Sequence, residues 1–331
     1  MRPPKPTVAI ISPALRKANN GNWQTAHRWS SFLRTGYDVT LASEWTAPTA
    51  SGLAPACLIA LHARRSAGSI ARFADACPAR PLIVVLTGTD LYRDIRNDTA
   101  AQRSLELATR LVVLQNEGPF ELSTEHREKC SVIYQSATTC QSAAVDTEYF
   151  DVVLVGHMRP EKDPLTPMRS LALLPDDSRV RLTHIGGALD DEYLRATQSL
   201  ATRAWPHGPR YVWLANLPHA ETRRRIARAQ ALVNSSVMEG GANVIIEAVV
   251  SGVPVLASRI PGNIGMLGRD YEGYFPPGDA GELAQLLEHA SRDTAFLSRL
   301  RQQCAQRAPL FAPARERAEV IKLVADALRP T

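Results

Sequence analysis

The sequence lacks the features that mark several common classes of protein. Its 331 residues include only five cysteines, with no Cys-x-x-Cys pair and no histidine at ligand spacing, so neither a disulfide framework nor a zinc site is indicated. No apolar run approaches the roughly 20 residues that a membrane-spanning helix needs. The amino-terminal stretch MRPPKPTVAIIS is too short and too poorly flanked to be a secretory signal. We therefore expect a soluble cytoplasmic protein that works in a reducing compartment.

Several nucleotide-binding and catalytic motifs are absent as well. There is no G-x-G-x-x-G after a strand and no G-x-x-x-x-G-K-[ST], which argues against a dehydrogenase and a P-loop NTPase. No D-x-D is present, so the usual carboxylate pair that holds a divalent ion on a nucleotide diphosphate is missing. No G-x-S-x-G points to an α/β-hydrolase. We expect neither a metal site nor a cofactor.

The charge balance is mildly basic. Thirty-eight Lys plus Arg against thirty-three Asp plus Glu give a formal charge of +5, which favours anionic small molecules. The densest basic run, RRRIARAQ from Arg223, has no interleaved aromatics and reads as the solvated face of a helix rather than a nucleic-acid site. We expect small-molecule partners, no nucleic acid and no membrane; the sequence leaves the oligomeric state open.

Short apolar runs alternate with helical patterns along the chain, which predicts parallel sheets covered on both faces by helices. A length of 331 residues allows two cores. The alternation pauses over residues 137–150 and then restarts. We predict an α/β fold of two doubly wound, Rossmann-like domains, residues 1–145 and 146–310, followed by a helix over 311–331 that can return to the first domain. The expected strands are TVAIIS, YDVTLAS, ACLIALH, LIVVLTG, RLVVLQN, SVIYQS, DVVLVGH, VRLTHIGG, PRYVWLAN, QALVNSS and VPVLAS.

The stretch MEGGANVIIEA follows one of these strands and opens a helix. Gly240, Gly241 and Ala242 carry almost no side chain, so backbone N–H groups at the helix start can approach an anion closely. Glu239 lies at this mouth, and Glu247 lies about a turn and a half into the helix among apolar residues. A buried carboxylate needs a donor partner. The alternative is a capped helix with one structural ion pair.

A complementary loop follows the strand DVVLVGH. Gly156 ends the strand, and Arg159 and Lys162 come close behind it. Because ligands of open α/β sheets bind beyond the carboxyl ends of the strands, these cations can point into the same cleft as the glutamates. Their geometry suits a diphosphate. The alternative is a surface charge pair.

At residues 151–310 the chain resembles the carboxyl-terminal domain of retaining GT-B glycosyltransferases of the large, glycogen-synthase-like family four. The motifs that carry the likeness are VGHMRPEKDP, YVWLANLPHAE, NSSVMEGGANVIIEAVVSGVPVLAS and the PPGD turn. The resemblance implies a GT-B fold, in which two domains face a central cleft. It also implies a hexosyltransferase that uses a UDP-sugar without a metal.

The same resemblance implies roles for individual residues. Glu239 would lie near the transferred sugar, Glu247 would bond the ribose, and Arg159 and Lys162 would neutralise the diphosphate. Gly241 stands where the family usually has an aromatic, so the shape of the sugar pocket is not carried over. The full donor-binding set is Gly156, Arg159, Lys162, Leu217, Glu239, Gly240, Gly241, Ala242, Asn243 and Glu247, with Gly21 and Asn22 of the first domain.

The loops after the strands of the first domain are expected to choose the acceptor. Two arginines, two threonines and a glycine amide there suit a phosphate-like anion. His62 and Asp90 are candidates for proton handling in catalysis. Alternatively, His62 is a satisfied structural histidine and Asp90 an N-cap for DLYRDIR. The acceptor-binding candidates are Asn19, Asn20, His62, Arg64, Arg65, Thr87, Gly88 and Thr89.

These loops resemble a narrower group, the selenosugar synthases of selenoneine biosynthesis, through NNGNWQTAHRW, ALHARRSA and LTGTDLYRDI. The resemblance implies transfer of N-acetylglucosamine or glucose from a UDP-sugar to selenophosphate, forming a carbon–selenium bond before phosphate is lost. Selenium is a strong nucleophile that needs little help from a general base. Three alternatives stay open: a family-four transferase with another small polar or phosphorylated acceptor, a catalytically silent nucleotide-sugar binding protein, and a basic nucleic-acid binder.

Overall fold

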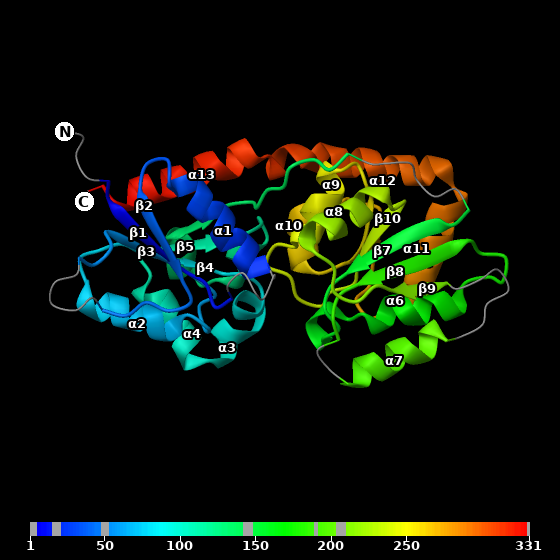
Figure 1. Ribbon diagram of the computed structural model, residues 1–331, viewed down its shortest axis with the longest axis horizontal. Helices are drawn as coiled ribbons and strands as arrows, with labels where there is room; N and C mark the ends of the chain where they lie inside the picture. Colours follow the sequence, from blue (N-terminus) through cyan, green and yellow to red (C-terminus); the bar gives the residue numbers. More distant parts are fainter. Residues whose placement is uncertain are drawn as a thin grey trace. The chain divides into compact units, whose positions relative to one another are not determined.

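The computed structural model of the protein describes residues 5–14, 21–47, 53–141, 148–188, 191–202 and 210–329. The chain divides into two compact units. Unit 1 comprises Met1–Gln135 together with Pro313–Thr331, and unit 2 comprises Ser136–Ala312. Each unit contains one six-stranded sheet (Figure 1). Among the described residues, no helix combines the length and the apolar character needed to cross a membrane.

Unit 1 is built around a parallel sheet in the order β2-β1-β3-β4-β5-β6. Every residue of β3 and β4 is buried, as expected of strands covered on both faces. The elements are β1 (Thr7–Ile11), α1 (Gly21–Leu33), β2 (Asp38–Ala42), β3 (Cys57–Leu61), α2 (Ala67–Ala76), β4 (Leu82–Val85), the π-helical η2 (Asp90–Asp94), α3 (Ile95–Asn97), α4 (Thr99–Leu107), β5 (Arg110–Val113), η3 (Gly118–Glu121), α5 (Thr124–Glu128), β6 (Cys130–Val132) and α13 (Pro313–Ala327).

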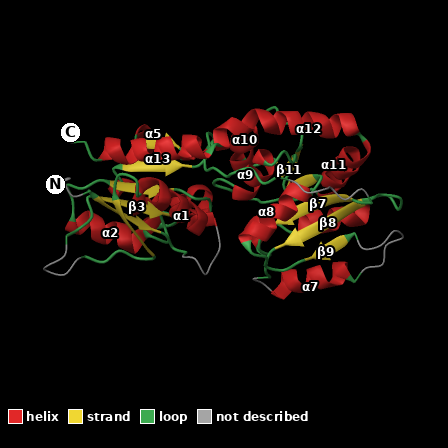
Figure 2. Ribbon diagram, turned by 45° about the horizontal axis from the view of Figure 1, so that its top comes forward, coloured by secondary structure: helices red, strands yellow, loops and turns green. Residues whose placement is uncertain are grey.

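The helices of unit 1 form two layers on opposite faces of its sheet (Figures 1 and 2). On one face, Trp29 of α1 and Val320 of α13 share a core with the strands. On the other face, Ile70 and Phe73 of α2 pack with Leu105 of α4. The helix α13, far from the rest of unit 1 in sequence, therefore completes one of its two cores.

A buried carboxylate fastens α13 to α1. Glu316 of α13 has no exposed surface and accepts hydrogen bonds from Trp29 Nε1 at 2.8 Å and from Arg28 Nε at 2.6 Å. The pair is charge-assisted and lies next to the apolar core that the two helices share. The contact fixes which face of α13 turns inward.

Unit 2 repeats the doubly wound plan with the order β12-β11-β10-β7-β8-β9, again all parallel. Its elements are β7 (Phe150–Val155), η4 (Pro160–Lys162), α6 (Leu165–Ser170), η5 (Leu171–Leu173), β8 (Val180–Ile185), α7 (Asp191–Ala201), β9 (Tyr211–Trp213), α8 (His219–Arg228), β10 (Ala231–Asn234), α9 (Asn243–Val250), β11 (Val255–Ser258), α10 (Pro261–Leu267), β12 (Tyr274–Phe275), α11 (Ala280–Arg292), α12 (Thr294–Arg307) and η6 (Ala308–Phe311).

The strand order of unit 2 reverses between β7 and β10. From β7 the chain proceeds outward to β8 and β9, and it then returns to β10 on the other side of β7. Right-handed crossovers therefore place α6 and α7 on one face and α8 and α9 on the other. The carboxyl ends of β7 and β10 lie side by side while their chains lead to opposite faces. Such a reversal is the usual position of a ligand site in this kind of sheet.

Every apolar run that the sequence marks as a strand forms one. The helix expected after the double glycine is α9, and Gly252, with a left-handed φ of 76°, ends it as predicted. The sequence did not predict β12, because its two residues are too few to show a pattern; it is held by pairing with β11. The fold class is confirmed.

Glu316→Ala is expected to lower the free energy of unfolding by about 2 kcal/mol, because it leaves the Arg28 guanidinium and the Trp29 N–H without their acceptor in the interior. Lys322→Ala on the same helix removes an exposed pair with Asp326 and should cost no more than about 0.5 kcal/mol. Denaturant titration of both variants tests this. Equal losses of unfolding free energy in the two variants would show that the buried Glu316 contact stabilises the fold no more than the exposed pair does.

Candidate active site

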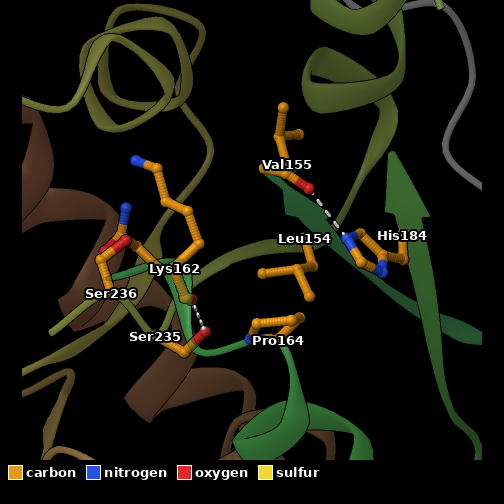
Figure 3. A pocket seen from close by; sticks show the side chains of 9 residues that line it. Leu154, Val155, Lys162, Pro164, His184, Ser235 and Ser236 are labelled. Atoms are coloured by element: carbon orange, nitrogen blue, oxygen red, sulfur yellow. Dashed lines mark hydrogen bonds between the residues drawn. The ribbon is translucent and has the colours of Figure 1, made fainter. Parts of the chain in front are cut away.

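Two loops leave neighbouring strands at one edge of the unit 2 sheet. β7 ends at Val155 and leads into η4, while β10 ends at Asn234 and leads to the loop that carries Glu239. The strands pair in parallel, so both loops begin at the same edge. The Ser235 hydroxyl of the second loop donates to the Lys162 carbonyl of the first at 3.0 Å (Figure 3).

Lys162 and Glu239, both identified from the sequence, are in direct contact. Lys162 Nζ donates to Glu239 Oε1 at 2.5 Å. The Ser236 hydroxyl donates to the same oxygen at 2.5 Å, and Asn234 Nδ2 lies 3.5 Å from it. Glu239 is only 7% exposed. Its other oxygen, Oε2, accepts no hydrogen bond from any described residue, so the carboxylate is held by one oxygen and free at the other.

Positive charge dominates the surroundings of this carboxylate. Burial works to raise the pKa of Glu239, but the Lys162 ammonium and the hydrogen bonds to Oε1 outweigh it, so the pKa lies below its ordinary value and the group is ionised at neutral pH. Burial lowers the pKa of His157, and the charges of Arg159 and Lys162 lower it further. His157 is therefore neutral, and the two cations set the charge of the loop after β7.

The Arg159 side chain has no partner among the described residues. It is half-buried, and its Nε is shielded from solvent with no acceptor in the described part of the chain. A shielded guanidinium nitrogen without an acceptor is costly. The planar donors of arginine match the oxygens of a phosphate group. Arg159 is therefore arranged for an anion that the described chain does not supply.

The start of α9 adds further donors. Its N-cap is Ala242, whose side chain cannot accept a hydrogen bond, so the first turn has no side-chain cap. Within the described residues, the N–H groups of Gly241, Asn243 and Val244 have no acceptor. Free N–H groups and the helix dipole favour an anion at this position. The Gly240 to Asn243 segment thus lies where the sequence predicts a helix start open to a ligand.

The buried Glu247 has the donor partner that the sequence analysis requires, a partly exposed histidine. Glu247 is 6% exposed, and its Oε1 lies 2.6 Å from Nε2 of His219 at the start of α8. Its Oε2, like that of Glu239, accepts no hydrogen bond among the described residues. His219 is not among the residues predicted from the sequence, although it lies two positions after Leu217, which is half-buried in the loop between β9 and α8.

A buried histidine holds the main chain at the end of β7. His184 Nε2 donates to the Gly156 carbonyl at 3.0 Å (Figure 3). Its Nδ1 accepts from the Tyr211 hydroxyl at 2.9 Å. Burial lowers the pKa of His184 to about 4, so the ring is neutral. Beside it lies a small pocket that is partly open to solvent. The residues that line the pocket are Leu154, Val155, Gly156, Lys162, Pro164, His184, Asn234, Ser235 and Ser236.

In unit 1, the helix start predicted to approach the donor is only partly described. α1 begins at Gly21, which is exposed, and Asn22 is half-buried. The Thr25 hydroxyl donates back to the Gly21 carbonyl at 2.8 Å, which closes the first turn. Asn19 and Asn20 lie outside the described residues.

Asp90 joins the loops that follow β3 and β4. It is fully buried, and its oxygens accept from the N–H groups of Ala63 at 3.0 Å and of Thr87 and Gly88 at 2.9 Å each. The N-cap position of η2 is Thr89, so Asp90 does not cap that helix. Asp90 thus organises the rim, and it occupies N–H groups that the sequence analysis had assigned to the acceptor.

His62 lies in the same cluster with an unusual backbone. Its φ is 71°, a left-handed value that is rare outside glycine, and the residue is 2% exposed. Nδ1 accepts from the Arg65 N–H at 3.3 Å, so Nε2 carries the proton that bonds the Thr89 hydroxyl at 3.0 Å. Burial lowers the pKa of His62 against the opposing charge of Asp90. The ring is neutral at pH 7, and both nitrogens are in use.

The two arginines of this rim differ. Arg64 Nε bonds Asp98 at 2.7 Å, and Asp98 also caps α4 through the Ala101 N–H. Arg65 is exposed and forms no ion pair within the described ranges. The sequence analysis treated the two alike, because it did not anticipate the pairing with Asp98 more than thirty positions away. Arg65 is the one that remains available to an anion.

Glu239→Gln should flatten the acid limb of the stability profile. The pKa of Glu239 is lower in the folded chain than in the unfolded one, so its stabilising contribution is full above about pH 4.5 and is lost as the pH falls through the folded value. We expect wild type to lose more unfolding free energy than the variant between about pH 5 and 3. Glu282→Gln, at an exposed position of α11, is the control. Parallel profiles for Glu239→Gln and wild type would contradict the expectation.

The segment of unit 2 that carries this site is similar to known proteins. Residues 149–293 match the family model described as glycosyl transferases group 1. The chain is also similar to glycosyltransferase 1 domain-containing protein 1 of Xenopus tropicalis, with 28% identity over 215 residues. That alignment covers 58% of this chain and 61% of the relative, so the chain spans less than two thirds of the relative's length.

Solved structures agree on the fold. Anabaena HepE, in complex with UDP and glucose, matches with a TM-score of 0.75 and 16% identity over 97% of this chain and 99% of that one. Sucrose-phosphate synthase from Thermosynechococcus elongatus matches with a TM-score of 0.78 and 15% identity over the same shares. The chain therefore has the GT-B fold, and its segment 149–293 is similar to the group 1 glycosyl transferases.

Proposed function

We propose that the protein is a glycosyltransferase that takes a sugar from a UDP-sugar bound in unit 2. The observation that carries the proposal is the set of groups left unsatisfied at one edge of the sheet. In the described part of the chain, Arg159 Nε lacks an acceptor, the start of α9 has free N–H groups, and Glu239 and Glu247 each have one oxygen without a partner. The family match over residues 149–293 and the UDP and glucose bound to HepE support the same reading.

Each unsatisfied group has a part of the donor to bind. Arg159, Lys162 and the start of α9 would bind the diphosphate, the free oxygen of Glu247 a ribose hydroxyl, and that of Glu239 a hydroxyl of the sugar. When the bond between the anomeric carbon and the diphosphate oxygen breaks, the electron pair stays on that oxygen. Fixed donors stabilise this charge by about 3 kcal/mol each.

We further propose that transfer needs no metal. Arg159 has no carboxylate partner within the described residues, so its charge remains available to the diphosphate, and Lys162 is shared with Glu239 only. Two cations and a helix start supply the charge that a divalent ion provides in other transferases. The five cysteines are all free thiols, which fits a proposed location in the reducing cytoplasm.

The proposed acceptor is selenophosphate, on the strength of the likeness of the unit 1 loops to selenosugar synthases. A selenium lone pair would attack the anomeric carbon as the bond to UDP breaks, and water would then cleave the selenium–phosphorus bond to release phosphate. Arg65 is the free cation of this rim. His62 is neutral and already bonded, which suits a nucleophile that arrives as an anion and needs no base.

A second acceptor class has its own supporting observation. Asp98 occupies Arg64, and Asp90 occupies the N–H groups of Thr87 and Gly88. These bonds reduce the number of free donors for a phosphate-like group. Within the alternative class of small polar or phosphorylated acceptors, they favour the polar ones.

A transfer assay separates these acceptors. Purified protein incubated with UDP-glucose or UDP-N-acetylglucosamine and selenophosphate should release UDP and form a selenium-containing sugar, both detected by mass spectrometry. Addition of EDTA should leave the rate unchanged. UDP release that ignores selenophosphate would favour the second acceptor class. Absence of any UDP-sugar binding would overturn the donor assignment itself.

Arg159→Ala should lower kcat at least about a hundredfold, because it removes a donor that acts on the leaving diphosphate. The variant should fold normally, since Arg159 loses no protein partner. Arg301→Ala, at an exposed position of α12, is the matched control and should leave kcat unchanged. Wild-type kcat in Arg159→Ala, measured at saturating donor, would remove this residue from the site.

A further inference from the structure

The first turn of α10 lies directly behind Glu239. Gly262 has no room for a side chain, since a Cβ there would lie 1.9 Å from the Glu239 carbonyl oxygen and 3.0 Å from the Glu239 Cβ. The next residue, Asn263, has no exposed surface. No motif in the sequence connects α10 with the glutamate, which lies more than twenty positions earlier. The close approach shows that the two segments are packed against each other without slack.

Asn263 is the donor at the base of a buried polar network. Its Nδ2 lies 2.9 Å from the Ser258 carbonyl, 3.0 Å from the Ser258 hydroxyl and 3.2 Å from Asn234 Oδ1. A carbonyl oxygen can only accept, so the orientation of the Asn263 amide is fixed. All three partners belong to β10, to β11 or to the ends of these strands.

Two routes lead from Asn263 to the carboxylate. In the shorter-bonded route, the Ser258 hydroxyl donates to the Ser236 carbonyl at 2.5 Å, and the Ser236 hydroxyl donates to Glu239 Oε1 at 2.5 Å. In the other, Asn234 accepts from Asn263 through Oδ1, which turns its Nδ2 toward Glu239 Oε1 at 3.5 Å. Both routes end on the same oxygen. The other oxygen of Glu239 accepts no hydrogen bond from this network or from any other described residue.

The side-chain amide of Asn263 has a cost to the stability of the fold. Its Oδ1 is buried and has no hydrogen-bond partner in the described structure. An unsatisfied buried acceptor lowers the stability of the fold, whereas an apolar side chain of similar shape carries no such penalty. The residue thus retains a costly group at a position that fixes the orientation of two neighbours of Glu239.

We propose that Asn263 is a positioning residue for the sugar-transfer reaction: through Ser258, Ser236 and Asn234 it holds Glu239 Oε1 and so directs Oε2 toward the transferred sugar. The inference rests on the proposed function, in which Glu239 contacts the donor sugar. Asn263 itself touches no substrate. It acts by removing the rotational freedom of a carboxylate whose geometry matters in the transition state.

Asn263→Leu tests the proposal, because leucine has a similar branched shape and removes both the donor and the unsatisfied oxygen. We expect an unfolding midpoint equal to or above that of wild type, a kcat lower by about tenfold or more, and little change in KM for the UDP-sugar. In a Glu239→Gln background the same substitution should have almost no further effect on kcat. A loss of kcat that is equally large in that background would overturn the proposal.

A second readout needs no turnover. NMR titration of the Glu239 side-chain carboxyl carbon should show a pKa moved upward in Asn263→Leu, because the donors on Oε1 are no longer held in place. Asn263→Ala should show the same shift and serves if the leucine variant does not fold. Gln230→Ala is the matched control. It removes side-chain amide hydrogen bonds to the Asp151 N–H and the Tyr149 carbonyl, at the other end of β10.

The outcomes distinguish the positioning role of Asn263 from the proposed sugar-transfer function. An unchanged Glu239 titration in both variants of Asn263, or a shift equally large in Gln230→Ala, would overturn the positioning role. Loss of kcat accompanied by an equal loss of folded protein would show a merely structural role and would overturn it too. A shifted Glu239 titration in a protein that turns over no UDP-sugar would support the positioning of Glu239 by Asn263 and would overturn the proposed function instead.

Discussion

The loops of unit 2 converge on one oxygen atom, Oε1 of Glu239. Lys162 reaches it from the loop after β7, and Ser236 and Asn234 reach it from the end of β10. The lysine and the glutamate are 77 positions apart, and only the pairing of their strands brings them together. A carboxylate so deeply buried is tolerated only when its donors are in place. The sheet order, the ion pair and the unoccupied Oε2 are therefore one arrangement.

The positive charge of this site comes from Arg159 and Lys162, because His157 and His184 are neutral. Burial lowers the pKa of both His157 and His184, so neither adds a proton near the cations at neutral pH. Glu239 neutralises Lys162, while Arg159 stays without a counter-charge among the described residues. Arg159 and the start of α9 thus remain available to an anion.

Much of this could be predicted from the sequence, because strands buried on both faces read as continuous apolar runs and parallel strands end at one edge. That the loops of Lys162 and Glu239 begin at the same edge followed from that rule, and the need for a partner at Glu247 followed from the cost of burying a carboxylate; the direct ion pair of Lys162 with Glu239 did not follow from either. The identity of the partner, His219, did not follow, because it depends on how α8 packs on α9. Asn263 and the pairing of Arg64 with Asp98 were invisible for the same reason. Side-chain contacts between segments that are distant in the sequence produce no periodic pattern of residues from which they could be predicted.

The placement of α13 in unit 1 has a consequence for how the chain folds. Val320 and Val324 belong to a core whose other members come from the first strands and from α1, whereas unit 2 is complete at Ala312. During synthesis from the amino terminus, the second unit made can therefore finish folding before the first. Until α13 emerges, Trp29 and Leu33 lack their cover. An apolar face left exposed during this interval can associate with other chains.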